Sequence, residues 1–275
     1  MAGRFEGKVL FVTGAARGQG RNHAIRFARE GADVIAIDAC RDIETVDYPG
    51  ATRDDFDETV RAVEAHDRRI VASVVDIRDR TGVVAALDEG VAQLGRVDVV
   101  SANAGIAGFA AAADLTEDAW RTMIDINLTG QFFTAQAAIP HLVRQGDGGS
   151  IVFTSSIAGL KGTGFLSHYS AAKHALVGLA RSLANELAPN RIRVNTIHPT
   201  NVDTPMIQNE SLKTLFGGPD LSREDYAAAM TSMNLLQIPW VDADDVSEAL
   251  MFLASDAGRF LTGVALPVDA GLVVK

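Results

Sequence analysis

Residues 8–20 read KVLFVTGAARGQG, an apolar run that passes directly into a glycine-rich loop. The run is rich in β-branched and aromatic side chains, which favour a buried strand. Gly14, Gly18 and Gly20 follow it, and a helical pattern begins at residue 21. Glycine lets a backbone turn tightly and approach a phosphate, and a helix that starts there offers free N–H groups to an anion. The stretch therefore predicts a strand–loop–helix unit that cradles a dinucleotide pyrophosphate.

Apolar runs of this kind recur along the chain and alternate with helical patterns. We predict strands at residues 8–13, 32–37, 70–75, 97–101, 150–154, 193–197 and 264–268. We predict helices at residues 21–30, 55–66, 82–94, 117–143, 167–187 and 244–254, with Thr116 capping the fourth. Near-continuous apolar strands that alternate with helices are typical of a parallel sheet covered on both faces. We therefore expect one α/β domain, 1–275, built as a Rossmann-type doubly wound sheet.

Two stretches interrupt this alternation. Residues 41–53, here called the insertion, are long for a strand-to-helix connection, and we expect them near a bound adenosine. Residues 206–240 are irregular, and we expect them to form a lid over the substrate. Their apolar side chains favour an apolar substrate such as a terpenoid, a steroid or a lipid alcohol, but they also suit a plain core. These side chains are Met206, Ile207, Leu212, Leu215, Phe216, Met230, Met233 and Trp240.

The bulk composition disfavours several classes of partner. The formal net charge is -10, whereas a nucleic-acid binder needs a basic surface and an anionic membrane would repel this chain. No apolar stretch reaches the ~20 residues of a membrane helix, and the short apolar run at the N-terminus does not resemble a signal peptide. Cys40 is the single cysteine, so no intrachain disulfide is expected. We expect a cytoplasmic protein with a small-molecule substrate.

The six histidines show no zinc-type spacing with a carboxylate or thiolate partner. We therefore predict no metal site.

The second strand ends at Asp38, 18 residues after Gly20. A carboxylate in this position accepts hydrogen bonds from both ribose hydroxyls of an adenosine. It also repels the 2′-phosphate of NADP by about 4 kcal/mol, for charges ~4 Å apart at an effective dielectric of about 20. Arg17 and Arg41 are the cations that would offset this repulsion. The sequence predicts NAD as the cofactor.

Further polar and small residues follow the third and fourth strands, so they face the same crevice beyond the strand ends. Asp76 and Ile77 follow the third strand, and Asp76 is a candidate for the adenine amino group. Asn103, Ala104 and Gly105 follow the fourth and would let the backbone pass close to the ribose. Each of these alone suits a turn equally well. The loop residues of the predicted pyrophosphate site are Gly14, Ala16, Arg17, Gly18, Gln19 and Gly20.

Tyr169 and Lys173 are four residues apart at the start of a helical pattern, so their side chains share a face. A phenol becomes a useful base at neutral pH only when its pKa falls by about 3 units, or roughly 4 kcal/mol. We expect the Lys173 ammonium and a positive nicotinamide ring to supply this stabilisation. Ser156 precedes Tyr169 by 13 residues and would hydrogen-bond the substrate oxygen, with Ser155 as the competing choice.

Asn127 falls inside the predicted helix at 117–143, where asparagine is unfavourable. A functional Asn127 would bind a water that links Lys173 to solvent.

These motifs together resemble the classical short-chain dehydrogenase/reductases, in family order and over almost the whole chain. The resemblance implies seven parallel strands, Tyr169 as acid/base, Lys173 as its tuner, Ser156 as substrate orienter and Asn127 as proton relay. It also implies that the segment Pro199, Val202 and Thr204 contacts the nicotinamide carboxamide, and that four copies assemble through the helices that contain Asn127 and Tyr169. Thr200 departs from the family's usual glycine, and threonine does not adopt a positive φ cheaply.

A narrower resemblance is to the actinobacterial subgroup related to carveol dehydrogenase. It rests on GAARGQGRNHA, on the segment after Asp38 and on HPTNVDTPM. The subgroup is associated with the redox carrier mycofactocin, and its NAD is thought not to be released. The resemblance implies that the insertion clamps the adenosine, whereas a surface loop without function is the alternative.

Three other functions fit parts of the pattern. An NAD(H)-binding regulatory protein would keep the fold without the chemistry, but the intact set of Ser156, Tyr169, Lys173 and Asn127 disfavours this. A sugar-nucleotide epimerase or dehydratase would have a differently spaced glycine loop and a longer C-terminal domain. A 3-oxoacyl thioester reductase shares the whole motif set and differs only in its substrate.

Overall fold

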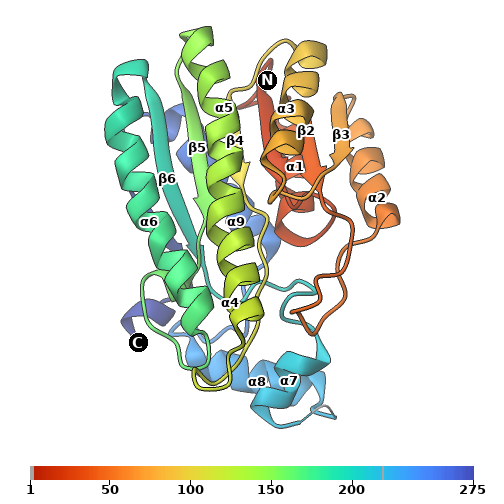
Figure 1. Ribbon diagram of the computed structural model, residues 1–275, viewed down its shortest axis with the longest axis vertical. Coiled ribbons are helices and arrows are strands. Elements are labelled where there is room, and N and C mark those ends of the chain that lie inside the picture. Colours follow the sequence, from red (N-terminus) through yellow and green to blue (C-terminus); the bar gives the residue numbers. More distant parts are fainter. Residues whose placement is uncertain (1–2, 219) are drawn as a thin grey trace.

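A seven-stranded parallel sheet forms the centre of the molecule, in the order β3-β2-β1-β4-β5-β6-β7. The computed structural model describes residues 3–218 and 220–275 (Figure 1), so residues 1–2 of the expected domain and residue 219 of the expected lid lie outside the described residues. The predicted fold, a single Rossmann-type doubly wound domain, is confirmed. The strands are β1 Val9–Thr13, β2 Asp33–Asp38, β3 Ile70–Val74, β4 Val99–Ala102, β5 Gly149–Thr154, β6 Ile192–Pro199 and β7 Ala265–Val268.

Helices cover both faces of this sheet. In Figure 1, α3, α5 and α6 lie in front of the strands, and α1 and α9 lie behind them. The helices are α1 Gly18–Arg29, α2 Arg53–Glu64, α3 Arg80–Leu94, α4 Glu117–Ile124, α5 Gln131–Gln145, α6 Ser167–Leu187, α7 Glu210–Phe216, α8 Arg223–Met233 and α9 Ala243–Ala254. No helix within the described residues combines the length and the apolarity that crossing a membrane requires.

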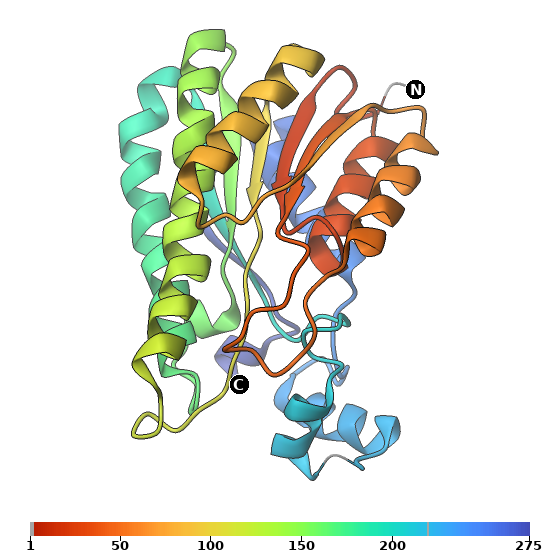
Figure 2. The ribbon, with the colours of Figure 1, turned by 45° about the vertical axis from the view of Figure 1, so that its right-hand side comes forward.

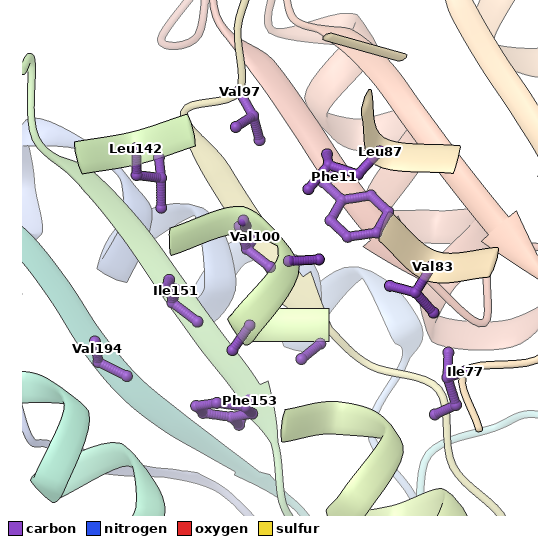
Figure 3. Close-up of a cluster of buried hydrophobic side chains, with 14 of the residues drawn as sticks. Phe11, Ile77, Val83, Leu87, Val97, Val100, Leu142, Ile151, Phe153 and Val194 are labelled. Atoms are coloured by element: carbon purple, nitrogen blue, oxygen red, sulfur yellow. The ribbon is translucent and has the colours of Figure 1, made fainter. Parts of the chain in front are cut away.

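The strands are apolar throughout because both of their faces are covered. Phe11 packs into the cluster between the sheet and α3 and α5, together with Val100 and Ile151 (Figure 3). Its neighbours Leu10 and Val12 point to the opposite face and join the second cluster. Successive side chains of a strand alternate between faces, so a strand buried on both sides shows no polar alternation. Each of these five side chains is fully buried.

The single helix predicted over residues 117–143 is wrong in its middle. Thr116 caps α4 as expected, because its hydroxyl accepts the N–H of Ala119 at 3.1 Å. Between α4 and α5, however, Asp125–Gly130 form one turn of π-helix. The wider turn lies where the side chain of Asn127 bonds to the backbone of Ile106, and such turns often accompany functional sites.

The prediction of irregular structure over residues 206–240 is also wrong, because α7 and α8 lie within it. Asn209 caps α7 by accepting the N–H of Leu212, and Ser222 caps α8 in the same way. Both helices lie beyond the carboxyl ends of the strands, below the sheet in Figure 2. They were missed because each is short and their shared apolar cluster is small.

Candidate active site

A cavity of about 660 Å³ lies at the carboxyl ends of the strands and reaches from the glycine loop to the lid. The structure therefore brings the two halves of the predicted site together in one space. The predicted site residues that line it are Gly14, Arg17, Gly18, Gln19, Asp38, Asp76, Ile77, Asn103, Ala104, Gly105, Ser156, Tyr169, Lys173, Pro199, Val202 and Thr204. Ala16, Gly20 and Asn127 lie behind this lining.

The glycine loop needs its glycines for two different reasons. Gly14 and Gly18 have φ values of +67° and +56°, in the left-handed region that glycine adopts without strain. At Gly20 a Cβ would lie 2.0 Å from the carbonyl oxygen of Gly14, so any side chain there would push the loop off the helix. The loop thus turns directly from β1 into α1, and the N-terminus of α1 borders the cavity, where it fits a pyrophosphate.

Asp38 ends β2 and is held by two main-chain donors. The N–H of Ala16 donates to its Oδ2 and the N–H of Cys40 to its Oδ1, each at 2.9 Å. Each carboxylate oxygen has a further lone pair, so the side chain still fits two ribose hydroxyls. The geometry therefore suits the adenosine of a dinucleotide.

Both cations that would offset the charge of Asp38 are engaged elsewhere. Arg17 donates to the carbonyl oxygens of Pro49 and Gly50 in the insertion. Arg41 forms an ion pair with Asp76. A 2′-phosphate placed next to Asp38 would therefore meet a carboxylate without a free arginine from this pair, which favours NAD over NADP.

Asp76 is more strongly paired than the sequence indicated. Burial opposes its ionisation, but hydrogen bonds from Arg78 and Arg41 outweigh this and lower its pKa to about 2. The carboxylate therefore stays charged at neutral pH and is shared between two arginines. An adenine amino group would have to share it as well.

The side chain of Asn103 ties three strand ends together. Its Nδ2 donates to the carbonyl oxygen of Thr13 at 3.0 Å, and its Oδ1 accepts from the hydroxyl of Thr154 at 3.3 Å. From the sequence, this position was expected only to let the backbone pass close to a ribose. The structure adds that Asn103 fixes the relative positions of β1, β4 and β5 at the cavity edge.

Tyr169 and Lys173 lie one turn apart at the start of α6, as predicted. The Nζ of Lys173 is 5.5 Å from the centroid of the Tyr169 ring and donates to the carbonyl oxygen of Thr154 at 2.8 Å. The hydroxyl of Ser156, just beyond β5, interacts with the phenol of Tyr169. The three side chains therefore meet in the cavity from two different elements.

The structure separates Ser156 from Ser155. The hydroxyl of Ser155 donates to the backbone carbonyl of Lys173 at 2.8 Å, which joins β5 to α6. Ser156 accepts the N–H of Ala158 at 3.1 Å and keeps its own proton for another partner. Ser156 is therefore the serine that can reach a substrate oxygen.

The protein's own groups do not lower the pKa of the phenol. Burial raises the pKa of Tyr169 to about 12, although the hydrogen bond from Ser156 opposes the rise. Burial also lowers the pKa of Lys173 to about 7, so its charge is only partly retained at neutral pH. The expected acidification of Tyr169 thus needs further positive charge beyond Lys173.

Asn127 lies in the π-helical turn and is fully buried. Its Oδ1 accepts the N–H of Ile106, and its Nδ2 donates to the carbonyl oxygen of the same residue, both at 2.8 Å. A Cβ on Gly105 would lie 2.8 Å from this Oδ1 and 3.4 Å from the Nζ of Lys173. The side chain therefore holds the loop beside Lys173, and both of its polar atoms are engaged in doing so.

The segment after β6 accommodates Thr200 without strain, because Thr200 is not among the residues with positive φ. Its N–H donates to the carbonyl oxygen of Val268 at 3.1 Å, and it is largely buried. Thr204 donates to the carbonyl oxygen of Val202 at 3.2 Å. The missing glycine thus leaves this side of the cavity intact.

The insertion reaches farther than the adenosine. The phenol oxygen of Tyr48 accepts the N–H of Ala107 at 3.1 Å, and Ile43 and Val46 also line the cavity. At its tip, Asp47 accepts the hydroxyl of Ser211 in α7 at 3.4 Å. Figure 2 shows this loop descending from β2 toward α7. The apolar and aromatic residues in an otherwise polar loop were the signal that the sequence analysis did not use.

The lid supplies most of the apolar wall. Seven of its eight predicted residues line the cavity: Met206, Ile207, Leu212, Leu215, Phe216, Met230 and Met233. Trp240 is the exception, since its ring packs against Tyr226 and the guanidinium of Arg223 lies 5.1 Å from its centroid. Phe109, Phe165 and Leu166 also line this end and were not predicted, because they lie in loops without periodicity.

A family model of the short chain dehydrogenases matches residues 8–214, which is most of the chain and covers both halves of the cavity. The protein belongs to this family. The fold and the site thus define an oxidoreductase of the alcohol dehydrogenase type.

Individual relatives narrow the comparison. The chain is 54% identical over 276 residues to (-)-trans-carveol dehydrogenase of Rhodococcus erythropolis, covering 99% of each chain. A crystal structure of carveol dehydrogenase from Mycobacterium avium in complex with NAD superposes with a TM-score of 0.97 at 50% identity, covering 99% of this chain and 100% of that one. A crystal structure of a short chain dehydrogenase from Mycobacterium paratuberculosis bound to NAD superposes with a TM-score of 0.92 at 43% identity. The match covers 99% of this chain and 100% of that one. The carveol dehydrogenase-like resemblance seen in the sequence is confirmed.

Proposed function

We propose that the protein is an NAD-dependent oxidoreductase that interconverts an apolar secondary alcohol and its ketone. One observation carries the proposal: a single cavity holds the glycine loop and Asp38 at one end and Ser156, Tyr169 and Lys173 at the other. A dinucleotide that places its adenosine ribose at Asp38 spans this cavity toward Tyr169. The NAD complexes of the two similar structures support the choice of cofactor.

The bound nicotinamide ring supplies the hydride acceptor and a positive charge. Ser156 donates a hydrogen bond to the substrate oxygen and stabilises its developing charge. Tyr169 removes the hydroxyl proton as the hydride leaves, and returns it in the reverse direction. Lys173 holds the nicotinamide ribose and adds positive charge beside the phenol. Asn127 holds the Ile106 backbone and, with water, links Lys173 to solvent.

The remaining contacts to the cofactor follow from the cavity lining. The loop at Gly14–Gly20 holds the pyrophosphate, Asp38 the ribose, and Asp76 with Ile77 the adenine. Asn103, Ala104 and Gly105 shape the floor under the adenosine ribose. Pro199, Val202 and Thr204 line the cavity and would contact the nicotinamide carboxamide.

A cyclic terpenoid alcohol is the substrate class that we favour. The lid lines its end of the cavity with aliphatic, methionine and phenylalanine side chains, which favour an apolar ring over a charged metabolite. The 54% identity to a carveol dehydrogenase supports the same choice. A steroid or a lipid alcohol is compatible with this lining, and a 3-oxoacyl thioester is disfavoured by its long polar carrier.

The insertion is proposed to clamp the cofactor, so that NAD is held and re-oxidised in place by a redox carrier such as mycofactocin. Two contacts support a closed insertion, namely Arg17 to the carbonyl oxygens of Pro49 and Gly50, and Tyr48 to the N–H of Ala107. Together these contacts cross the cavity from the glycine loop to the loop after β4.

We also propose a cytoplasmic homotetramer. The single cysteine, Cys40, fits a reducing compartment. Trp120 on α4 and Val143 on α5 are large apolar side chains with exposed fractions of 42% and 39%, which supports an interface along these helices.

The test begins with the nucleotide. The purified protein is denatured, the released nucleotide is identified, and the native protein is assayed against cyclic terpenoid alcohols with NAD and, separately, with an artificial electron acceptor. We expect NAD in the supernatant and alcohol-dependent reduction in at least one assay. Turnover with the artificial acceptor but not with free NAD supports the clamp. Bound NAD that no alcohol reduces would instead indicate a regulatory NAD(H)-binding protein.

The clamp has its own variant. Replacing Tyr48 with alanine removes the contact to Ala107 at the far end of the insertion, and we expect NAD to be lost on desalting. Arg53→Ala is the matched control, because Arg53 ends the insertion and pairs with Asp57 within α2. Equal retention of NAD by both variants would argue for a loop without function.

A further inference from the structure

The main-chain link between β5 and β6 stops just before Ser156. The parallel register pairs Gly149–Thr154 with Ile192–Ile197. The last backbone bond across the two strands runs from the N–H of Ser155 to the carbonyl oxygen of Ile197, at 2.9 Å. Pro199 follows on β6 and has no N–H to donate. The strand pairing therefore ends before Ser156, the residue whose hydroxyl has to be oriented toward the substrate.

The side chain of His198 crosses this gap. Its Nδ1 lies 2.7 Å from the carbonyl oxygen of Ser156, and its Nε2 lies 2.7 Å from the hydroxyl oxygen of Thr196. A carbonyl only accepts, so Nδ1 carries the proton and Nε2 accepts from Thr196. His198 is fully buried, and burial lowers its pKa to about 4, which keeps the ring neutral at physiological pH.

Besides its contact with the phenol of Tyr169, Ser156 is held by three hydrogen bonds. Its carbonyl oxygen accepts the N–H of Gly159 at 2.9 Å in addition to His198, and its hydroxyl accepts the N–H of Ala158 at 3.1 Å. The bonds from Ala158 and Gly159 are local to the turn at Ile157–Gly159. Of the three, only the bond from His198 fixes this turn to the sheet, because β6 belongs to the rigid core.

We propose that His198 is a positioning residue for Ser156. The next strand bond would run from residue 199 to the carbonyl oxygen of Ser155 and is lost at proline, and the imidazole links β6 to the chain one residue farther on, at Ser156. The ring does not touch the substrate, and it acts only through the backbone of Ser156. The carbonyl oxygen of Ser156 selects the tautomer that donates from Nδ1, and the Thr196 hydroxyl holds the ring in place through Nε2. The proposal rests on the proposed function for the role of Ser156, but the hydrogen bonds themselves do not.

The kinetic test is a double-mutant cycle between His198 and Ser156. We expect His198→Leu to lower kcat about thirtyfold, because the hydroxyl loses its aim. The affinity for NAD should change less than twofold. In a Ser156→Ala background the same change at His198 should lower kcat by less than twofold, since there is no hydroxyl left to position. An equal loss in both backgrounds would show a general structural role and overturn the proposal.

Conservative variants keep the test decisive if the leucine variant fails to fold. His198→Asn retains a donor near the Nδ1 position, and we expect kcat within about threefold of the wild type. Thr196→Val removes the hydroxyl that holds the imidazole through Nε2, and we expect kcat to fall about fivefold. A larger fall in kcat in His198→Asn than in Thr196→Val would contradict the proposed geometry, because the donor retained by asparagine would then not restore activity.

A spectroscopic measurement is independent of activity. Nitrogen-15 NMR of histidine-labelled protein distinguishes a protonated from an unprotonated ring nitrogen, and the His198 signal is identified by its absence in His198→Asn. We expect a proton on Nδ1 in the wild type and also in Thr196→Val, because the carbonyl acceptor is unchanged. A proton on Nε2 in the wild type would overturn the inference even if the enzyme is active. Conversely, the expected tautomer in a protein that oxidises no alcohol would leave the geometry standing and remove the proposed function.

Discussion

The two ends of the cavity are built in different ways. At the nucleotide end, Asp38 at the end of β2 accepts the N–H of Ala16 in the loop after β1, and Asn103 after β4 donates to the carbonyl oxygen of Thr13 at the end of β1. At the substrate end, the lid packs around its own small cluster, formed by Ile207, Leu212, Tyr226 and Met230. The first end is therefore an extension of the sheet, whereas the second is a separate body placed over it.

The lid is attached near the ends of β6 and β7. The hydroxyl of Thr200 donates to Oδ1 of Asn234 at 3.4 Å, and the N–H of Leu235 donates to the carbonyl oxygen of Ala270 at 2.9 Å. We therefore expect chemistry and substrate specificity to reside in separate parts of the chain. Substitutions of residues that the sheet holds in place should affect kcat or the choice of cofactor, and substitutions in the lid should affect KM for the substrate.

The largest effect is expected at Tyr169. Tyr169→Phe removes the proton-transfer group while the ring still fills its place, so kcat should fall at least a thousandfold, or about 4 kcal/mol in transition-state energy. NAD binding should persist, as measured by fluorescence or by retention on desalting. Tyr226→Phe is the matched control, because the Tyr226 hydroxyl donates to the carbonyl oxygen of Ile207 inside the lid. Undiminished turnover in Tyr169→Phe would remove the proposed mechanism.

The second effect is a pH dependence of stability at Lys173. Its folded pKa of about 7 lies below the ordinary value near 10.4, so between these values the unfolded chain holds a proton that the folded protein lacks. Raising the pH through this window therefore stabilises the wild type. Lys173→Met removes the contribution of Lys173 to this pH dependence. The free energy of unfolding of the variant, relative to that of the wild type, should therefore fall by about 3 kcal/mol between pH 7 and pH 10.

The measurement is urea unfolding of both proteins after charcoal treatment to remove nucleotide. Tyr169 does not interfere below pH 10, because its raised pKa affects the free energy of unfolding only above the ordinary phenol value of 10. A constant difference between the variant and the wild type would mean that Lys173 is solvated in the folded protein.

The third effect is on cofactor choice at Asp38. Asp38→Ala removes the carboxylate that repels a 2′-phosphate, so the ratio of kcat/KM for NAD over that for NADP should fall about a hundredfold. Asp33→Ala is the control, because Asp33 begins the same strand and pairs with Arg69 far from the cavity. If both variants keep the wild-type ratio, the choice of cofactor is made elsewhere.

The smallest effect is expected in the lid. Leu215 lines the cavity although 54% of it is exposed, and Leu215→Ala should raise KM for an apolar alcohol about fivefold with kcat little changed. Leu236→Ala provides the comparison, because Leu236 is 71% exposed and does not line the cavity. A lower kcat without a change in KM would contradict this expectation, because Leu215 would then affect the chemical step rather than substrate binding.

The sheet and the nucleotide end could be predicted from sequence because their signals are local. The apolar run before Gly14 and the carboxylate at Asp38 follow directly from strand burial and from the contact that a ribose requires. Ser156 follows the end of a strand, and Tyr169 and Lys173 lie at the start of a helix. Their positions could therefore be predicted from the regular elements that they adjoin.

What could not be predicted depends on contacts distant in sequence. The π-helical turn at Asp125–Gly130 accompanies the bond from Asn127 to Ile106, which is not visible in periodicity. The reach of Tyr48 to Ala107 depends on how a long loop folds back. The pKa of Tyr169 rises because burial outweighs its polar neighbours, and burial inside a cavity is a property of the whole fold.

The π-helical turn also bears on how the gene tolerates changes of length. In an α-helix each residue advances about 100°, so one added or deleted codon rotates everything on one side of it and exposes a buried face. A π-turn already holds the surplus residue, and losing one codon there would yield an ordinary α-helical turn. The cost would be the anchor that Asn127 provides to the loop at Ile106. At this turn, deletion of one residue would therefore detach a loop but leave the helix continuous.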